Sequence, residues 1–206
     1  MGAWLSKNLF NFSKKNLPMI KISSTYFQKL LTRVFLITVI LLISVNTVYS
    51  NDRKLIGIDL FPSFLASDQN IRSKVGEDNL LHVVIAYQYD KKTANDMANR
   101  LKNLEKIRGI PIKVNMLSVD DIEYSEDQSI AGIFIAEPML PLVSIIKKSI
   151  DNHFIVFSPF EGDVEKGVTG GIYITEKIVP YINSKTLVLA EIKMKAFFLR
   201  VSKKYE

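Results

Sequence analysis

Residues 80 to 87 read LLHVVIAY, a run in which His82 is the one strongly polar residue. A run of this length, rich in apolar and β-branched side chains, is typical of a strand that is buried on both faces of a parallel sheet. We therefore predict that it forms the central strand of the fold. We also predict that His82 is a satisfied imidazole of the core and not a metal ligand.

The segment after this strand has the spacing of an amphipathic helix. Its apolar side chains recur at helical intervals, at Ala94, Met97, Ala98, Leu101, Leu104 and Ile107. Thr93 and Asp96 are placed like a capping pair, and Gly109 is placed to end the helix. The pattern predicts a helix of about four turns.

Strands and helices continue to alternate along the rest of the chain. Short apolar runs predict strands at Ile112 to Leu117, Ile130 to Ala136, Phe154 to Ser158 and Gly171 to Thr175. We predict an acidic loop from Asp120 to Asp127 and a helix from Pro138 through Ile150. Because this alternation builds parallel sheets with right-handed crossovers, we predict an α/β fold. The expected architecture is a single-domain, mostly parallel sheet flanked by helices, a Rossmann- or flavodoxin-like sandwich.

Charge is distributed unevenly along the chain. The formal net charge is +6, and residues 1 to 50 contain six basic side chains and no Asp or Glu. Residues 51 to 206 are therefore formally neutral, whereas a nucleic-acid-binding domain needs an excess of Lys and Arg on its surface. We expect no nucleic acid partner.

The basic N-terminal residues precede an apolar segment, VFLITVILLISVNTVYS, at Val34 to Ser50, whose strongly apolar part ends near Val45. At 1.5 Å per residue that part spans about 18 Å, less than the roughly 30 Å hydrocarbon core of a bilayer. We therefore predict a leader over residues 1 to 50 that is a cleavable signal peptide, with Met19 as a candidate start and cleavage after Ser50. An uncleaved anchor helix is the alternative, and in both cases the domain at residues 51 to 206 lies outside the cytoplasm.

The chain has no cysteine, which limits the chemistry of an exported domain. Disulfides, a lipid-modified cysteine, cysteine nucleophiles and zinc-thiolate sites are all excluded. The two histidines, His82 and His153, are far apart in the sequence, and neither has a second His at metal-ligand spacing. We expect no metal.

The loops that would hold a cofactor or a catalytic group lack the required residues. Neither a GxGxxG fingerprint nor a GxSxG elbow occurs. Asp90 lies where a flavodoxin-type domain presents N–H groups to phosphate. The third strand ends in Ala136-Glu137-Pro138, without the phosphoacceptor Asp of a receiver domain. We therefore expect neither a cofactor nor an enzyme.

One polar stretch, from Ser158 to Gly171, combines an aromatic side chain with three alternating carboxylates. Their spacing lacks the remaining ligands of an EF-hand loop. An aromatic anchor beside a charged rim is typical of protein interfaces, although a solvated loop that joins two strands is the alternative. The candidate partner-binding residues are Phe160, Glu161, Asp163 and Glu165. Gly170 and Gly171 are expected to have positive φ where the chain re-enters the sheet.

Several features of the C-terminal half follow one another with a recognisable spacing. They are a strand at Phe154 to Ser158, the pair Gly170-Gly171, a short strand ending in Ile182-Asn183, and an apolar helical region from Ile192 to Tyr205. In this order they resemble the YfiR-like family of small bacterial periplasmic proteins. The predicted strands and export segment agree over the rest of the chain. Where that family begins its domain with an aromatic helix ending in Trp-Pro, this chain has Leu60 to Leu65, LFPSFL.

The resemblance implies a periplasmic regulatory module and not an enzyme. It implies that the partner is a membrane-bound signalling protein, such as a diguanylate cyclase of cyclic-di-GMP signalling, which the module restrains through its periplasmic sensory domain. The alternative is a small periplasmic solute-binding protein of a transport system, although about 155 residues barely furnish the two lobes that such proteins use. A homo-oligomer is left open.

The C-terminal segment is expected to belong to the core. Burial of a large apolar side chain is worth about 1.5 to 3 kcal/mol. We therefore predict burial of Phe197, Phe198, Leu199 and Val201. We also expect Asn183 to cap a helix that begins near Ser184.

Overall fold

The structure, a computed structural model, describes residues 24 to 124 and 129 to 206. The chain divides into two compact units, one that ends at Val45 and one that runs from Asn46 to Glu206. Helix α1, Ser24–Ser67, includes residues of both units. The features below belong to the second unit unless the first is named.

The predicted leader lies partly outside the described residues. Its candidate start at Met19 is not among them, and the predicted cleavage point after Ser50 falls within α1. In the described ranges, no helix is both long enough and apolar enough to cross a membrane. Export therefore stays a prediction.

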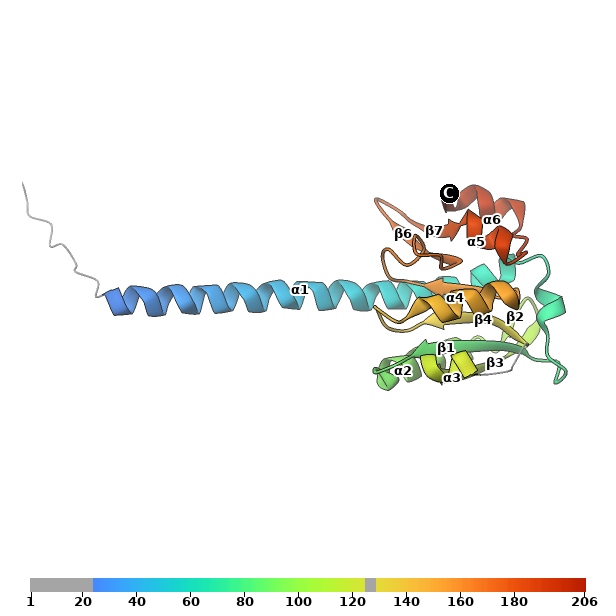
Figure 1. The fold of residues 1–206 in the computed structure, drawn as a ribbon, viewed down its shortest axis with the longest axis horizontal. Coiled ribbons are helices and arrows are strands. Elements are labelled where there is room, and N and C mark those ends of the chain that lie inside the picture. Colours follow the sequence, from blue (N-terminus) through green and yellow to red (C-terminus); the bar gives the residue numbers. More distant parts are fainter. Residues whose placement is uncertain (1–23, 125–128) are drawn as a thin grey trace, which may run out of the picture. The chain divides into compact units, whose positions relative to one another are not determined.

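The second unit is built on an eight-stranded sheet with the order β2-β3-β1-β4-β5-β6-β7-β8. Figure 1 shows β6 and β7 at one end of this sheet, near α5 and α6, and β1 and β3 toward the other. The strands are β1 Leu81–Tyr87, β2 Lys106–Ile107, β3 Ile110–Ser118, β4 Ile130–Ile135, β5 Ile155–Ser158, β6 Gly170–Ile174, β7 Ile178–Asn183 and β8 Lys203–Tyr205. Strands β3, β1, β4, β5 and β6 pair in parallel, while β2 and β7 pair antiparallel with β3 and β6. The predicted α/β fold with a mostly parallel sheet is confirmed.

Strand β1 lies between β3 and β4, as the apolar run predicts. All its side chains are buried except those of His82 and Tyr87, which are half-buried. The His82 ring Nε2 lies 3.0 Å from both carboxylate oxygens of Asp78. This hydrogen bond is the main cause of the lowered pKa of Asp78. His82 is therefore a satisfied imidazole, as predicted, but it lies half-buried near the start of the central strand and not in the core.

Helices cover both faces of the sheet. They are α2 Lys91–Lys102, α3 Val119–Tyr124, α4 Leu142–Asp151, α5 Ser184–Leu189 and α6 Ala196–Val201, with a short 3-10 turn, η1, at Ile71–Lys74. The C-terminal part of α1 packs on one face with α2 and α6, and α3 and α4 pack on the other. The first face is held by a chain of aromatic contacts, with centroids 4.8 to 5.8 Å apart, among Phe61, Phe64, Phe134, Phe157 and Phe198. The apolar pattern does not predict the helix at residues 51 to 67, which supplies much of this core.

Three element boundaries differ from those predicted. Helix α2 ends at Lys102 and not near Gly109, because the chain turns into the hairpin of β2 and β3. Its N-cap is Asp90, whose carboxylate accepts a hydrogen bond from the Thr93 N–H at 2.9 Å. The predicted acidic loop begins instead with helix α3, and residues 125 to 128 lie outside the description. Helix α4 begins at Leu142 and not at Pro138, with Pro141 at its N-cap position.

The C-terminal segment joins the core through fewer residues than predicted. Phe198 is buried and its ring centroid lies 4.8 Å from that of Phe64. Leu199 is partly buried against the same core. Phe197 and Val201 are both exposed, so the prediction that all four apolar residues are buried is wrong for these two. A short helix such as α6 has one inward face, which cannot bury consecutive side chains alike.

The cap predicted for Asn183 is confirmed. Its side-chain oxygen accepts a hydrogen bond from the Thr186 N–H at 2.9 Å, at the start of α5. Its amide nitrogen donates to the Val164 carbonyl oxygen at 2.8 Å. Asn183 therefore joins three segments of the fold and has a structural role.

The predicted reason for the Gly-Gly pair is wrong. Neither Gly170 nor Gly171 has positive φ. A Cβ at Gly170 would instead lie 2.2 Å from the Phe64 ring, and one at Gly171 would lie 2.6 Å from the Ser158 carbonyl oxygen. The glycines are required by close packing and not by backbone conformation.

Candidate functional site

The carboxyl ends of the parallel strands form the first place to seek a site. Strand β1 is flanked by β3 on one side and β4 on the other. The connection after β1 leads to β3, and the connection after β4 leads to β5 on the opposite side. In sheets of this kind ligands bind where the loops diverge, at the carboxyl ends of the strands. Here those loops follow β1 and β4. We call this side of the domain the carboxyl edge.

Glu137, in the loop after β4, occupies the point where these loops meet. Its carboxylate accepts hydrogen bonds from three consecutive backbone N–H groups of the loop after β1. Oε1 accepts from Gln88 and, at 2.8 Å, from Tyr89, and Oε2 accepts from Asp90 at 3.0 Å. The residue is 7% exposed. A carboxylate of the chain therefore fills the place where a doubly wound domain holds an anionic ligand.

The Asp90 carboxylate beside Glu137 also accepts hydrogen bonds from groups of the chain itself. Hydrogen bonds from Thr93 lower the pKa of Asp90, and the charges of Lys54 and Lys92 lower it further. Two acidic groups thus lie in or beside the loop that follows β1. This arrangement disfavours a phosphate ligand, because an incoming anion would meet two negative charges.

The same edge carries three exposed apolar side chains. Tyr89 is 86% exposed, Met139 is 91% exposed and Val143 is 83% exposed. Tyr89 and Met139 belong to the two loops that Glu137 joins, and Val143 lies in the first turn of α4. Met139 also has φ of 62°, a conformation that costs a residue with a Cβ about 1 to 2 kcal/mol. We call these three residues the apolar rim.

Of the four predicted partner-binding residues, the structure places Asp163 inside the domain. Its Oδ2 accepts a hydrogen bond from the Ser158 hydroxyl at 2.7 Å, and its Oδ1 lies 3.0 Å from the Lys166 ammonium. Asp163 is buried and therefore holds the loop to strand β5. The expectation that it lies with the other two carboxylates on an exposed surface is wrong. Local alternation of charges does not reveal the Ser158 partner.

The other three predicted residues remain accessible to different degrees. Glu161 is 90% exposed and lies 3.9 Å from Arg53, which also donates to the Pro159 carbonyl oxygen at 3.0 Å. Phe160 is half-buried against the core cluster on the α4 side. Glu165 is exposed and accepts a hydrogen bond from the Tyr181 hydroxyl at 3.0 Å. Of the predicted residues, Glu161 is thus the most exposed charge at the carboxyl edge, where it pairs with Arg53.

The Tyr181 contact ties this loop to strand β7. Burial and the bond to Glu165 raise the pKa of Tyr181 to about 12. The loop from Pro159 to Gly167 is therefore docked at both ends. Among the residues that the structure describes, no group of three or more His, Asp or Glu side chains is arranged to hold a metal ion.

The opposite side of the sheet, the amino edge, contains two adjoining hollows that the sequence analysis missed. Their volumes are about 360 and 180 Å³, and both are lined by Ser73, Lys74 and His153. The Lys74 ammonium lies 2.5 Å from Asp68 Oδ2, although neither atom makes a hydrogen bond of normal geometry. Asp68 is buried, and Lys74 nearly so. We call this feature the amino-edge groove.

Two helix ends bring charged or titratable side chains to this groove. His153 and Glu191 have φ of 59° and 53°, at positions after α4 and α5 where glycine is favoured. Both helices end in a Schellman motif, with Phe154 N–H donating to the Ser149 carbonyl and Ile192 N–H to the Leu187 carbonyl. His153 Nδ1 lies 3.1 Å from the Ala190 carbonyl oxygen. Because a carbonyl oxygen can only accept, Nδ1 is the donor of this hydrogen bond.

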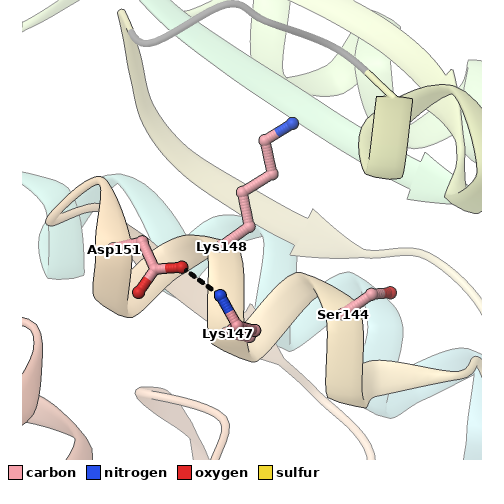
Figure 2. Close-up of a pocket in the computed structure, with 4 residues that line it drawn as sticks. All are labelled: Ser144, Lys147, Lys148 and Asp151. Atoms are coloured by element: carbon pink, nitrogen blue, oxygen red, sulfur yellow. Dashed lines mark hydrogen bonds and ion pairs between the residues drawn. The ribbon is translucent and has the colours of Figure 1, made fainter.

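A third hollow lies along α4 and has a volume of about 260 Å³. Figure 2 shows its four lining side chains, Ser144, Lys147, Lys148 and Asp151, on one helix. Lys147 pairs with Asp151 at 2.6 Å, and Lys148 donates to the Ile122 carbonyl oxygen at 2.7 Å. Both ammonium groups therefore have partners within the chain, and this hollow is a poor candidate for an anion site.

Comparisons with known proteins identify no family. No family model and no curated protein match the sequence. Among solved structures, the ABC domain in complex with L-Trp from Streptococcus pneumoniae has 10% identity and a TM-score of 0.43, over 68% of this chain and 59% of its own. A conserved domain protein from Vibrio cholerae has 14% identity and a TM-score of 0.46, over 65% of this chain and 57% of its own. The chain thus spans less than two thirds of either structure.

Proposed function

We propose that residues 51 to 206 form an exported binding domain that regulates a membrane-bound signalling protein through direct contact. The contact surface is the apolar rim of Tyr89, Met139 and Val143, with Glu161 at the same edge. The domain has no catalytic role of its own. Its place of action is the periplasm, and the partner class is the one that the resemblance to the YfiR-like family implies, such as a diguanylate cyclase.

One observation carries this proposal: the favoured ligand position of the sheet is filled by Glu137, while the same edge exposes the apolar rim. A domain that bound a nucleotide or an anionic substrate there would leave the backbone N–H groups available to it. Exposed aromatic and apolar side chains with a charged neighbour are instead what protein interfaces use as anchors.

The first residues of the predicted domain lie at the carboxyl edge. Arg53 contacts Pro159 and Glu161, and Lys54 acts on the pKa of Asp90, so the chain enters the domain at the carboxyl edge. The apolar rim lies at the same edge.

The test is capture of membrane proteins by the tagged full-length chain in the envelope of its own bacterium. Tyr89→Ser combined with Met139→Ser should weaken capture about tenfold, because truncation of interface anchors costs 1 to 2 kcal/mol or more. Val188→Ser, which changes a 76% exposed residue on α5, is the matched control and should leave capture unchanged. Unchanged capture by a folded double variant would contradict the proposal, and capture of a second copy of the chain would replace it with self-association.

Export has a separate test. The basic leader, its short apolar segment and the small residue at Ser50 predict a mature protein that begins near Asn51. Intact mass spectrometry of the envelope fraction measures this directly. A cytoplasmic protein that keeps residues 34 to 50 would rule out both the signal peptide and the anchor.

A second candidate function, solute binding, is favoured by the amino-edge groove. The groove offers an imidazole at His153 and a carboxylate at Glu191, beside the buried pair of Lys74 and Asp68. These groups suit the ammonium end of a small solute such as a free amino acid. Calorimetric titration with a panel of amino acids tests this, with Glu191→Gln as the weakened variant and Glu161→Gln as the control. Binding that depends on Glu191 would favour this function over the regulatory one.

A further inference from the structure

The contacts of Glu137 differ from those of an ordinary buried acid. Among the described residues it has no Lys, Arg or His as ion-pair partner, and its charge is met by backbone N–H groups alone. The three donors are consecutive, at Gln88, Tyr89 and Asp90. Successive N–H groups that converge on one point form a concave site for an anion, and burial strengthens each bond.

The loop after β1 is therefore organised around a negative charge that comes from elsewhere in the chain. Glu137 is separated from its donors by more than forty residues, and its backbone belongs to the loop after β4. The backbone also ties the two strands at this level, since the Ala136 N–H donates to the Ala86 carbonyl oxygen at 3.0 Å. That bond holds the ends of β1 and β4 together without the carboxylate.

We propose that the three N–H groups of Gln88, Tyr89 and Asp90 are an anion-binding site whose native occupant is the chain's own Glu137. When the Glu137 side chain is removed, the site accepts a small free carboxylate. This site exists whether or not the apolar rim binds a partner.

The geometry fixes which carboxylate fits. Glu137→Ala removes the Cγ atom and the carboxyl group, which together match the heavy atoms of acetate. Acetate therefore replaces the missing atoms without added volume, and the charge-assisted bonds to the three N–H groups are restored. Acetamide has the same shape but is neutral and carries donors toward the N–H groups, so it does not bind.

The experiment measures the melting temperature of E137A in chloride, acetate and acetamide at constant ionic strength. E137A should melt below the unsubstituted chain. Acetate should raise its melting temperature saturably, by about 3 °C once its concentration is about five times the dissociation constant. Acetamide should leave it unchanged. The unsubstituted chain and E161A, which loses an exposed carboxylate, should not respond to acetate.

A second measurement places the anion. In ¹H–¹⁵N spectra of E137A, acetate should shift the amide signals of Gln88, Tyr89 and Asp90 above all others. If E137A is unfolded in chloride, acetate should restore a cooperative transition. The proposal is overturned by an E137A chain that remains unfolded in acetate, by a melting rise that acetamide equals, or by shifts spread over the surface.

Discussion

The two edges of the same sheet differ in what occupies them. At the carboxyl edge, where a parallel sheet usually binds ligands, the donors of the loop after β1 are saturated by Glu137. At the amino edge, where no topological rule predicts a site, a groove lies over the buried pair of Asp68 and Lys74. A parallel sheet therefore positions backbone N–H donors at its carboxyl edge, but those donors need not be available to a ligand. An internal side chain can convert a ligand site into a structural joint and leave the surface around it for other contacts.

The largest expected effect tests the amino edge. Lys74→Met removes one partner of the buried pair and leaves the Asp68 charge without its cation, which should destabilise the domain by about 3 to 5 kcal/mol. Urea unfolding measures the loss. Adding Asp68→Asn should recover part of it, because the uncompensated charge is then gone. A Lys74→Met chain as stable as the unsubstituted one would show that the groove is solvated. The domain would then need no partner for the Asp68 charge to remain folded.

Glu137→Gln is the equivalent change at the carboxyl edge and should cost less, about 2 kcal/mol. The amide keeps the shape and one acceptor, but it turns charge-assisted bonds into neutral ones and points N–H donors at backbone N–H groups. The midpoint of urea unfolding, compared with that of Glu161→Gln, measures the difference. Equal midpoints for the two variants would mean that the three N–H groups of the loop after β1 do not require a negative charge as their acceptor.

The sequence predicted the sheet well because its strands are encoded locally. The apolar run at Leu81 to Tyr87 predicts a central buried strand, and the structure places it there. The helix at residues 51 to 67 was missed because its apolar residues adjoin the leader and Pro62 lies inside it. Its inward side chains can be recognised as core residues only from their packing on Phe134 and Phe157, which lie in strands far along the chain.

The candidate site was predicted poorly because it depends on distant pairs. In the sequence, Glu137 stands out only as the residue in place of a phosphoacceptor Asp, because its three donors are more than forty residues away. The alternating carboxylates after Phe160 were grouped by local pattern, but Asp163 turns inward to Ser158. The one available signal was the loop after β1, which lacks phosphate-binding residues and yet must satisfy its N–H groups when buried.

A smaller effect tests whether the loop from Pro159 to Gly167 is docked at the carboxyl edge. The pKa of Tyr181 is raised from 10.0 to about 12, so the folded state favours the neutral phenol. The resulting stabilisation is complete below pH 10 and is lost as the pH rises from 10 toward 12, by about 1 kcal/mol at pH 11. Urea unfolding of the unsubstituted chain and Tyr181→Phe should therefore converge as the pH rises. A constant difference in stability between the two chains over this pH range would show that the bond from the Tyr181 phenol to Glu165 does not hold the loop.

The smallest expected change in stability comes from two glycine substitutions, one at each edge. Their effects on partner capture show which edge is the contact surface. Met139 and Glu191 both have φ near the left-handed value, 62° at the carboxyl edge and 53° at the amino-edge groove, and neither is a glycine. Glycine pays little for this conformation, so Met139→Gly and Glu191→Gly should each stabilise the domain by about 0.5 to 1 kcal/mol in urea unfolding. If the carboxyl edge is the contact surface, Met139→Gly should nevertheless weaken capture of the membrane partner, while Glu191→Gly should leave it intact. The reverse pattern, in which only Glu191→Gly impairs binding, would move the functional surface to the amino-edge groove, because a more stable fold cannot itself explain a loss of binding.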